Sequence, residues 1–102
     1  MAFRDKYDFE FLKNEAESLV INELEKQLLS YNKQICLCND CVLDMVAIAL
    51  NNIKPLYRAS LMGALYTATA MEQAVYAESI QNAVSSAIEK VSKNPSHGPS
   101  DN

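Results

Sequence analysis

All three cysteines of this chain, Cys36, Cys38 and Cys41, fall within six residues and directly precede an apolar run over residues 42–50. Asp44 is the only polar residue in that run. A helix that is apolar nearly all round is normally buried, so the run predicts a helix enclosed on all sides. Three thiols at the entrance to that helix can converge on one metal ion. The chain is therefore expected to form a helical core with a cysteine loop at its edge.

Composition narrows the classes of protein to which the chain can belong. Its 102 residues suffice for one small domain, which we place at residues 1–92, followed by a disordered tail at 93–102. A net charge of −4 and an isoelectric point of about 4.8 argue against nucleic-acid binding, which needs cations. No apolar run reaches the roughly 18 residues of a membrane span, and the N-terminus lacks a signal-peptide core. We expect a cytoplasmic protein, in which reduced cysteines favour metal or redox chemistry over a disulfide.

Three segments have the spacing of helices, and no strand signal stands out. The first, residues 8–29, carries an apolar stripe at three- and four-residue steps. The second starts near Asn39 or Asp40, which are good N-caps, and ends near residue 53. Pro55 stops it, because the residue before a proline avoids helical geometry. The fold class that follows is all-α.

The third segment, residues 60–91, is long for so small a domain. An unbroken helix of that length would measure about 45 Å at 1.5 Å per residue, whereas a compact domain of this size has a radius of gyration of about 13 Å. Either the helix breaks, most readily at residues 79–82, or a second chain covers it. We prefer the second solution, which predicts a long C-terminal helix in an intertwined homodimer.

The cysteine spacing suits a structural zinc site. Cys38 and Cys41 have the two-residue gap that turns both side chains toward one ion, and Cys36 lies one alternation earlier. The start of the following helix favours thiolates through its dipole. The same residues also fit ordinary unreactive thiols, or a redox pair of Cys38 and Cys41. The fourth zinc ligand is left open between Asp40, Asp44, His97, a water molecule and a group from a partner chain.

A second candidate site follows the apolar helix. The turn at Lys54 and Pro55 leads to Tyr57 and Arg58, an aromatic ring beside a guanidinium group that can stack on a base and bind a phosphate. The chain has two arginines, so a bidentate contact to an anion must use Arg58 or Arg4. A plain helix–helix connection, with Tyr57 packed and Arg58 solvated, also fits this spacing.

No catalytic machinery is recognisable in the sequence. The one histidine lies in the predicted tail, so no Ser–His–Asp set can be built around it, and no glycine-rich phosphate loop is present. We therefore expect a binding protein and not an enzyme.

Taken together, the motifs of residues 36–57 resemble the late-competence ComFB family, and the resemblance covers roughly residues 7–92. It implies a small all-helical, dimeric protein whose cysteine cluster can hold zinc. The family often has Pro-Pro-Arg-Tyr where this chain has Lys54-Pro55-Leu56-Tyr57, with the arginine displaced to Arg58. The matching pattern is Cys36-x-Cys38-x-x-Cys41, then Asp44, Ala49-Leu50-Asn51 and Pro55-x-Tyr57.

The resemblance also implies a function. Members of the family, notably cyanobacterial ones, act as receptors for cyclic dinucleotide second messengers, and the family was named from a competence operon. It implies a homodimeric receptor in bacterial signalling that binds cyclic di-GMP or cyclic di-AMP. The candidate ligand-binding residues are then Lys54, Tyr57, Arg58 and Arg4. The alternative is a structural zinc-bearing adaptor for a regulatory protein partner, linked to competence and DNA uptake.

Overall fold

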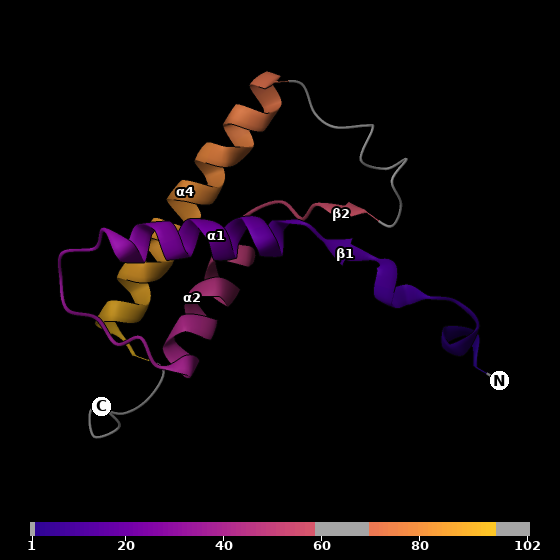
Figure 1. The fold of residues 1–102 in the computed structure, drawn as a ribbon, viewed down its shortest axis with the longest axis horizontal. Coiled ribbons are helices and arrows are strands. Elements are labelled where there is room, and N and C mark those ends of the chain that lie inside the picture. Colours follow the sequence, from indigo (N-terminus) through magenta and orange to yellow (C-terminus); the bar gives the residue numbers. More distant parts are fainter. Residues whose placement is uncertain (1, 59–69, 96–102) are drawn as a thin grey trace.

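The computed structural model describes residues 2–58 and 70–95 of the chain. The predicted all-α class is confirmed, with one pair of very short antiparallel strands in addition. The described helices that build the core are α1 (Ala16–Leu29), α2 (Asn39–Leu50) and α4 (Ala70–Lys93) (Figure 1). The shorter elements are the 3-10 helices η1 (Phe3–Lys6) and η2 (Phe9–Phe11) and the strands β1 (Lys13–Asn14) and β2 (Tyr57–Arg58).

The first α-helix begins later than its apolar stripe predicts. The prediction of α-helix is wrong for residues 8–15, which form η2 and β1 and the turn into α1. The side-chain oxygen of Asn14 accepts a hydrogen bond from the Ala16 amide at 3.1 Å and from the Leu56 amide at 2.8 Å. The Glu15 amide donates to the Leu56 carbonyl at 2.7 Å. Because these bonds tie residues 14 and 15 to a distant loop, the helix starts only after them.

The second helix begins where the sequence predicts, at Asn39, and ends three residues before the predicted end near residue 53. Cys41, Met45 and Ala49 face the core at four-residue steps. The described residues do not cover the opposite face, since Leu43 is 57% exposed and Asp44 is also exposed. The prediction of a helix enclosed on all sides is therefore wrong for this chain alone, and Asp44 is solvated because it lies on the open face.

The C-terminal helix α4 runs without a break through residues 79–82, so the less favoured alternative of a break there is wrong. The predicted start near Ser60 lies outside the described residues. Its second half is buried at three- and four-residue steps from Ile80 to Val91, which keeps the helix continuous there. The helix ends at Lys93, and most of the predicted tail also lies outside the described residues.

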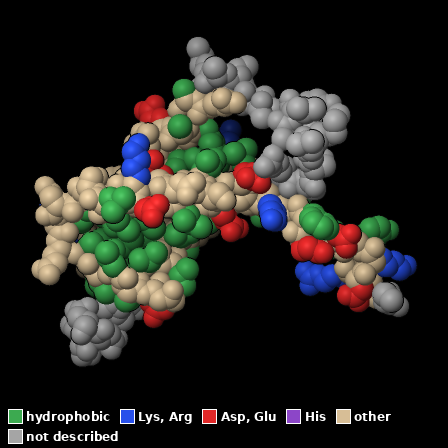
Figure 2. Space-filling view, viewed as in Figure 1, with side chains coloured by type: hydrophobic (Ala, Val, Ile, Leu, Met, Phe, Trp, Pro, Cys, Tyr) green, Lys and Arg blue, Asp and Glu red, His purple; other side chains and the backbone are tan. Residues whose placement is uncertain are grey.

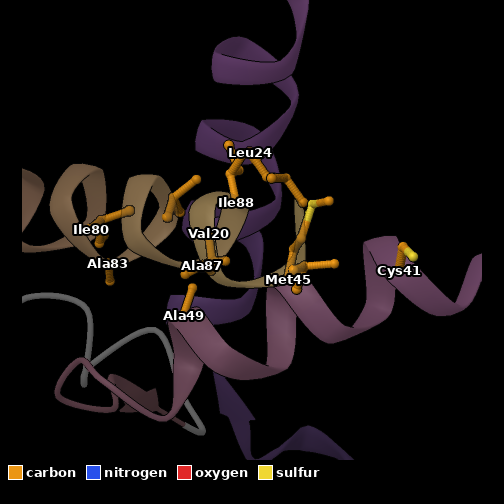
Figure 3. Close-up of a cluster of buried hydrophobic side chains, with 11 residues drawn as sticks. Val20, Leu24, Cys41, Met45, Ala49, Ile80, Ala83, Ala87 and Ile88 are labelled. Carbon is orange, nitrogen blue, oxygen red and sulfur yellow. The ribbon is translucent and has the colours of Figure 1, made fainter. Parts of the chain in front are cut away.

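The core lies where the three helices cross (Figure 3). Met45 of α2 points toward Leu24 of α1, with Ile88 of α4 beside them (Figure 3). Full burial of a side chain of this size contributes about 1.5–3 kcal/mol. The radius of gyration is 16.5 Å, above the about 13 Å of a compact domain of this length. The excess arises because the N-terminal segment and the start of α4 extend away from the core (Figure 1).

Candidate functional site

The three cysteines converge at the N-terminal end of α2. Their sulfur atoms lie within 4.8 Å of one another. On one tetrahedral zinc ion, with metal–sulfur bonds of about 2.3 Å, sulfur ligands lie about 3.8 Å apart. Cys41 is fully buried, and Cys36 and Cys38 are half-buried against the core. Since small side-chain rotations close the remaining gap, the three sulfur atoms can hold a metal ion.

The start of α2 sets this geometry. Cys38 is the N-cap residue, with extended backbone angles, and its sulfur accepts a hydrogen bond from the Cys41 amide at 3.4 Å. One helical turn therefore brings the sulfur of Cys38 and that of Cys41 to the same end of the helix. The positive end of the helix dipole lies at this position and favours negative charge there.

Electrostatics at the cluster favour a cation. The hydrogen bond from the Cys41 amide lowers the pKa of the Cys38 thiol, but desolvation and the neighbouring Cys36 and Cys41 side chains outweigh it. The pKa of Cys38 is therefore raised above its ordinary value of 9.0. Because adjacent thiolates repel one another, they accumulate only beside a positive charge. Thiolate ligands suit zinc and other soft or borderline metals, so the donor set fits the predicted ion.

The fourth ligand is not supplied by the part of the chain that the structure describes. Within residues 2–58 and 70–95, no further histidine, cysteine or carboxylate joins the three sulfur atoms. Asp40 and Asp44 are exposed and lie outside the group. His97 falls outside the described residues. His97, a water molecule and a group from a partner chain remain the predicted alternatives for the fourth ligand.

The second candidate site is the loop from residue 51 to residue 58, which we call the 51–58 loop. Lys54 is exposed in this loop, and the side chain of Tyr57 is 62% exposed. Tyr57 and Arg58 form strand β2, but the structure does not describe the side chain of Arg58. The interpretation of Tyr57 as a packed residue in a plain connection is therefore wrong, because its ring faces solvent.

Two residues outside this loop, Asn14 and Tyr76, hold its backbone. Asn14 binds the Leu56 amide through its side chain and pairs with Tyr57 across the strands. Tyr76 of α4 donates a hydrogen bond from its hydroxyl group to the Lys54 carbonyl. Burial raises the pKa of the Tyr76 hydroxyl above its ordinary value of 10.0, which keeps it protonated as a donor. The backbone of the loop is thus tied to the N-terminal segment and to α4.

The strand register adds a positive charge to this site. Lys13 lies opposite Arg58 in the antiparallel pair. In a chain of net charge −4, the 51–58 loop and its paired strand thus carry three cationic residues: Lys13, Lys54 and Arg58. Sequence spacing could not reveal Lys13, because the pairing joins residues 45 positions apart.

Arg4, the other candidate, lies in η1 at the end of the N-terminal segment. It is exposed, and Figure 1 shows η1 far from β2 along that segment. The structure therefore brings Lys54, Tyr57 and the Arg58 backbone together and does not bring Arg4 to them.

A small hollow of about 270 Å³ lies between the end of α1 and α4. It is smaller than the about 300–1,000 Å³ of usual small-molecule sites, and Glu89 on its wall disfavours an anion. No spacing signal in the sequence indicated it. It is lined by Gln27, Ser30, Tyr31, Asn32, Ser85, Ile88 and Glu89.

None of the described helices combines the length and the apolar character that crossing a membrane requires.

The fold and the site define a class: a small helical protein in which three cysteines cap a core helix and a short strand pair follows that helix. The sequence profile of the family described as late competence development protein ComFB matches residues 13–95. This chain belongs to the ComFB family. The description of that family names competence development and names no chemical reaction.

A solved structure supports the same fold. The late competence protein ComFB from Bacillus subtilis superposes with a TM-score of 0.60 at 22% sequence identity. The match covers 83% of this chain and 94% of that chain. No curated protein matches the sequence. At this level of identity the structural likeness establishes the fold, while the activity has to be argued from the residues of this chain.

Proposed function

We propose that this protein is a cytoplasmic, homodimeric receptor for a cyclic dinucleotide, with cyclic di-GMP as its first candidate ligand. The observation that carries the proposal is the 51–58 loop. Its backbone is held by hydrogen bonds to Asn14 and Tyr76, while Lys54 and Tyr57 remain exposed. Because the backbone of the loop is already fixed, ordering that backbone costs little conformational entropy when a ligand binds.

The chemistry of the loop matches that of the ligand. An exposed tyrosine ring offers a stacking face to a purine, an interaction that contributes about 1–3 kcal/mol per base in single-stranded nucleic-acid complexes. Lys13, Lys54 and Arg58 supply positive charge for the two phosphates of the ligand. A two-fold symmetric ligand also matches a two-fold dimer, in which each subunit would present the same loop.

Isothermal titration calorimetry tests this proposal. We expect cyclic di-GMP or cyclic di-AMP to bind the purified chain with a dissociation constant of tens of micromolar or tighter, about −6 kcal/mol or more favourable. Tyr57→Ala should weaken binding about tenfold through lost stacking, and Arg58→Ala should weaken it at least as much. Lys33→Ala changes an exposed cation outside the loop and should leave the affinity unchanged.

Each outcome of the titration has a definite meaning. Absence of heat with both nucleotides at tens of micromolar rejects the receptor proposal. Binding that Arg58→Ala leaves unchanged moves the site away from the 51–58 loop, with Arg4 as the next residue to substitute.

We further propose that the ion held by Cys36, Cys38 and Cys41 is zinc and that its role is structural. A bound ion would fasten the loop that precedes α2 to the start of that helix, next to the buried Cys41. Elemental analysis of freshly purified protein should give about one zinc per chain, completed by one further ligand. Less than a tenth of an equivalent would argue for unreactive thiols.

The second candidate function is a zinc-bearing adaptor for a regulatory protein. It is favoured by exposed apolar side chains such as Phe3, Phe11 and Leu43. This alternative predicts a defined protein partner in pull-down experiments and no affinity for cyclic dinucleotides. Nucleotide binding at the 51–58 loop would count against it.

A further inference from the structure

Two of the three cysteines occupy different environments on the first turn of α2. Cys38 is the N-cap residue and is half-buried, between the exposed residues Leu37 and Asn39. Cys41 lies three residues later on the same turn and is fully buried. Figure 3 shows Cys41 at the opposite end of α2 from Ala49. A small reagent in solution can therefore approach Cys38, whereas the protein screens Cys41.

The first turn of α2 holds these two sulfur atoms close together. The Cys41 amide donates a hydrogen bond to the Cys38 sulfur at 3.4 Å, and the two sulfur atoms lie within 4.8 Å of each other. Side chains three residues apart on a helix are neighbours, and a disulfide bond is about 2.05 Å long. Rotation of the two side chains can thus bring the sulfur atoms to bonding distance while the backbone of α2 stays in place.

Cys36 is placed differently from the other two cysteines. It precedes the N-cap, in a segment without regular secondary structure, so the first turn of α2 does not set the position of its sulfur atom. Residues two apart in an extended chain have Cα atoms about 6.6 Å apart, which is at the upper end of the range that a disulfide spans. The geometry therefore favours a bond between Cys38 and Cys41 and leaves Cys36 as the third thiol.

We propose that Cys38 and Cys41 form a reversible dithiol–disulfide pair that reacts with low-molecular-weight disulfides such as oxidised glutathione. The Cys38 thiolate attacks one sulfur of the small disulfide, forms a mixed disulfide and releases one small thiol. The Cys41 thiolate then attacks the Cys38 sulfur, closes the protein disulfide and releases the second small thiol. The protein gives up two electrons and two protons, and the small disulfide gains them.

The pair would couple the redox state of small thiols to metal binding. Reversible thiol chemistry is typical of two-residue cysteine spacings and of helix N-termini. Closing the disulfide consumes two of the three sulfur ligands, so the disulfide and a metal ion held by all three cysteines exclude each other. The inference goes beyond the receptor proposal and needs no nucleotide. A failed nucleotide titration leaves it standing, and a failed redox test leaves the receptor proposal to calorimetry.

Three serine variants of the full chain test the pair, because each variant keeps two of the three thiols. Cys36→Ser keeps the proposed pair, and Cys38→Ser and Cys41→Ser are its matched controls. Each is equilibrated in buffers with graded ratios of reduced to oxidised glutathione, quenched with acid and analysed by mass spectrometry. We expect the internal disulfide of Cys36→Ser to form with an equilibrium constant at least about tenfold above that of either control. Equal constants in all three variants overturn the proposal.

Disulfide mapping of the unsubstituted chain gives a measurement that does not depend on how the variants fold. After oxidation, the remaining thiols are alkylated, and the chain is cleaved after Leu37 and before Asp40, which separates all three cysteines. We expect the alkyl label on Cys36 alone, a disulfide that joins Cys38 to Cys41, and three free thiols again after dithiothreitol. A disulfide that includes Cys36, bonds between chains only, or three labelled thiols in the most oxidising buffer overturn the proposal.

Discussion

In the second half of α4, Ile80, Val84 and Ile88 are buried against α1 and α2, whereas in the first half no side chain of residues 73–79 is buried. The backbone is helical through both halves. The comparison separates two reasons for helix formation: core packing in the second half, and local propensity, with Tyr76 as the one half-buried side chain of residues 73–79, in the first half. It divides the described residues into a body that its own core stabilises and two extensions, the N-terminal arm (residues 2–12), which stands apart from the body in Figure 2, and the α4 overhang (residues 73–79).

Of the changes considered, removal of the metal should lower the stability of the body the most. If zinc fastens the cysteine loop to α2, saturation at about 1,000 times the dissociation constant stabilises the fold by about 4 kcal/mol. For a domain of this size that corresponds to a fall in melting temperature of roughly 20 °C after chelation. Calorimetric scans before and after chelation, and after zinc is restored, measure it. A change of less than about 2 °C would show that the cysteines do not stabilise the body through a metal.

Truncations in the two halves of α4 should differ strongly. Ile88→Ala should lower the free energy of unfolding by about 3 kcal/mol, because it leaves a cavity in the core. Val75→Ala, on the overhang, should cost less than about 0.5 kcal/mol in dilute protein. Urea denaturation at several protein concentrations measures both. If both variants lose the same free energy of unfolding in dilute protein, the division of α4 into two environments is contradicted.

The hydrogen bonds between Asn14 and the 51–58 loop should contribute less to the free energy of unfolding than the core packing does. Asn14→Ala removes the acceptor of the Ala16 and Leu56 amide bonds and should cost about 1–2 kcal/mol. Asn82→Ala, at an exposed position of α4, is the matched control and should stay within about 0.5 kcal/mol. If the two variants unfold at the same urea concentration, Asn14 does not hold the loop.

The smallest expected effect is a dependence of the free energy of unfolding on pH through Tyr76 of α4. Burial raises the pKa of the Tyr76 hydroxyl above 10.0 in the folded state. The folded state therefore binds this proton more tightly than the unfolded state, so its contribution is complete below about pH 10 and is lost as the pH rises through the folded-state pKa. Tyr76→Phe should remove this part of the alkaline dependence. An unchanged profile between pH 9 and pH 11 would mean that Tyr76 does not titrate with the fold.

The helices of the body could be read from the sequence because packing and propensity agree there. The spacing of Cys38 and Cys41 at the start of α2 likewise predicted that the cysteines meet. The late start of α1 could not be predicted, since the bonds of Asn14 reach a loop 42 residues further along the chain. Lys13 could not be predicted either. It pairs with a residue far along the chain, and a two-residue strand leaves no periodic pattern in the sequence. The prediction that the helix at residues 42–50 is enclosed on all sides was wrong, because apolar residues alone do not show which other residues cover them.

The central claim is that the 51–58 loop, whose backbone is held by Asn14 and Tyr76, binds an anionic nucleotide. Amide chemical-shift mapping of ¹⁵N-labelled protein during a cyclic di-GMP titration tests it most directly. We predict that the largest shifts fall on Lys13, Asn14, Lys54, Tyr57 and Arg58, and saturate with the affinity found by calorimetry. Shifts confined to the hollow around Gln27 and Glu89, or no saturable shifts at tens of micromolar, would contradict the claim.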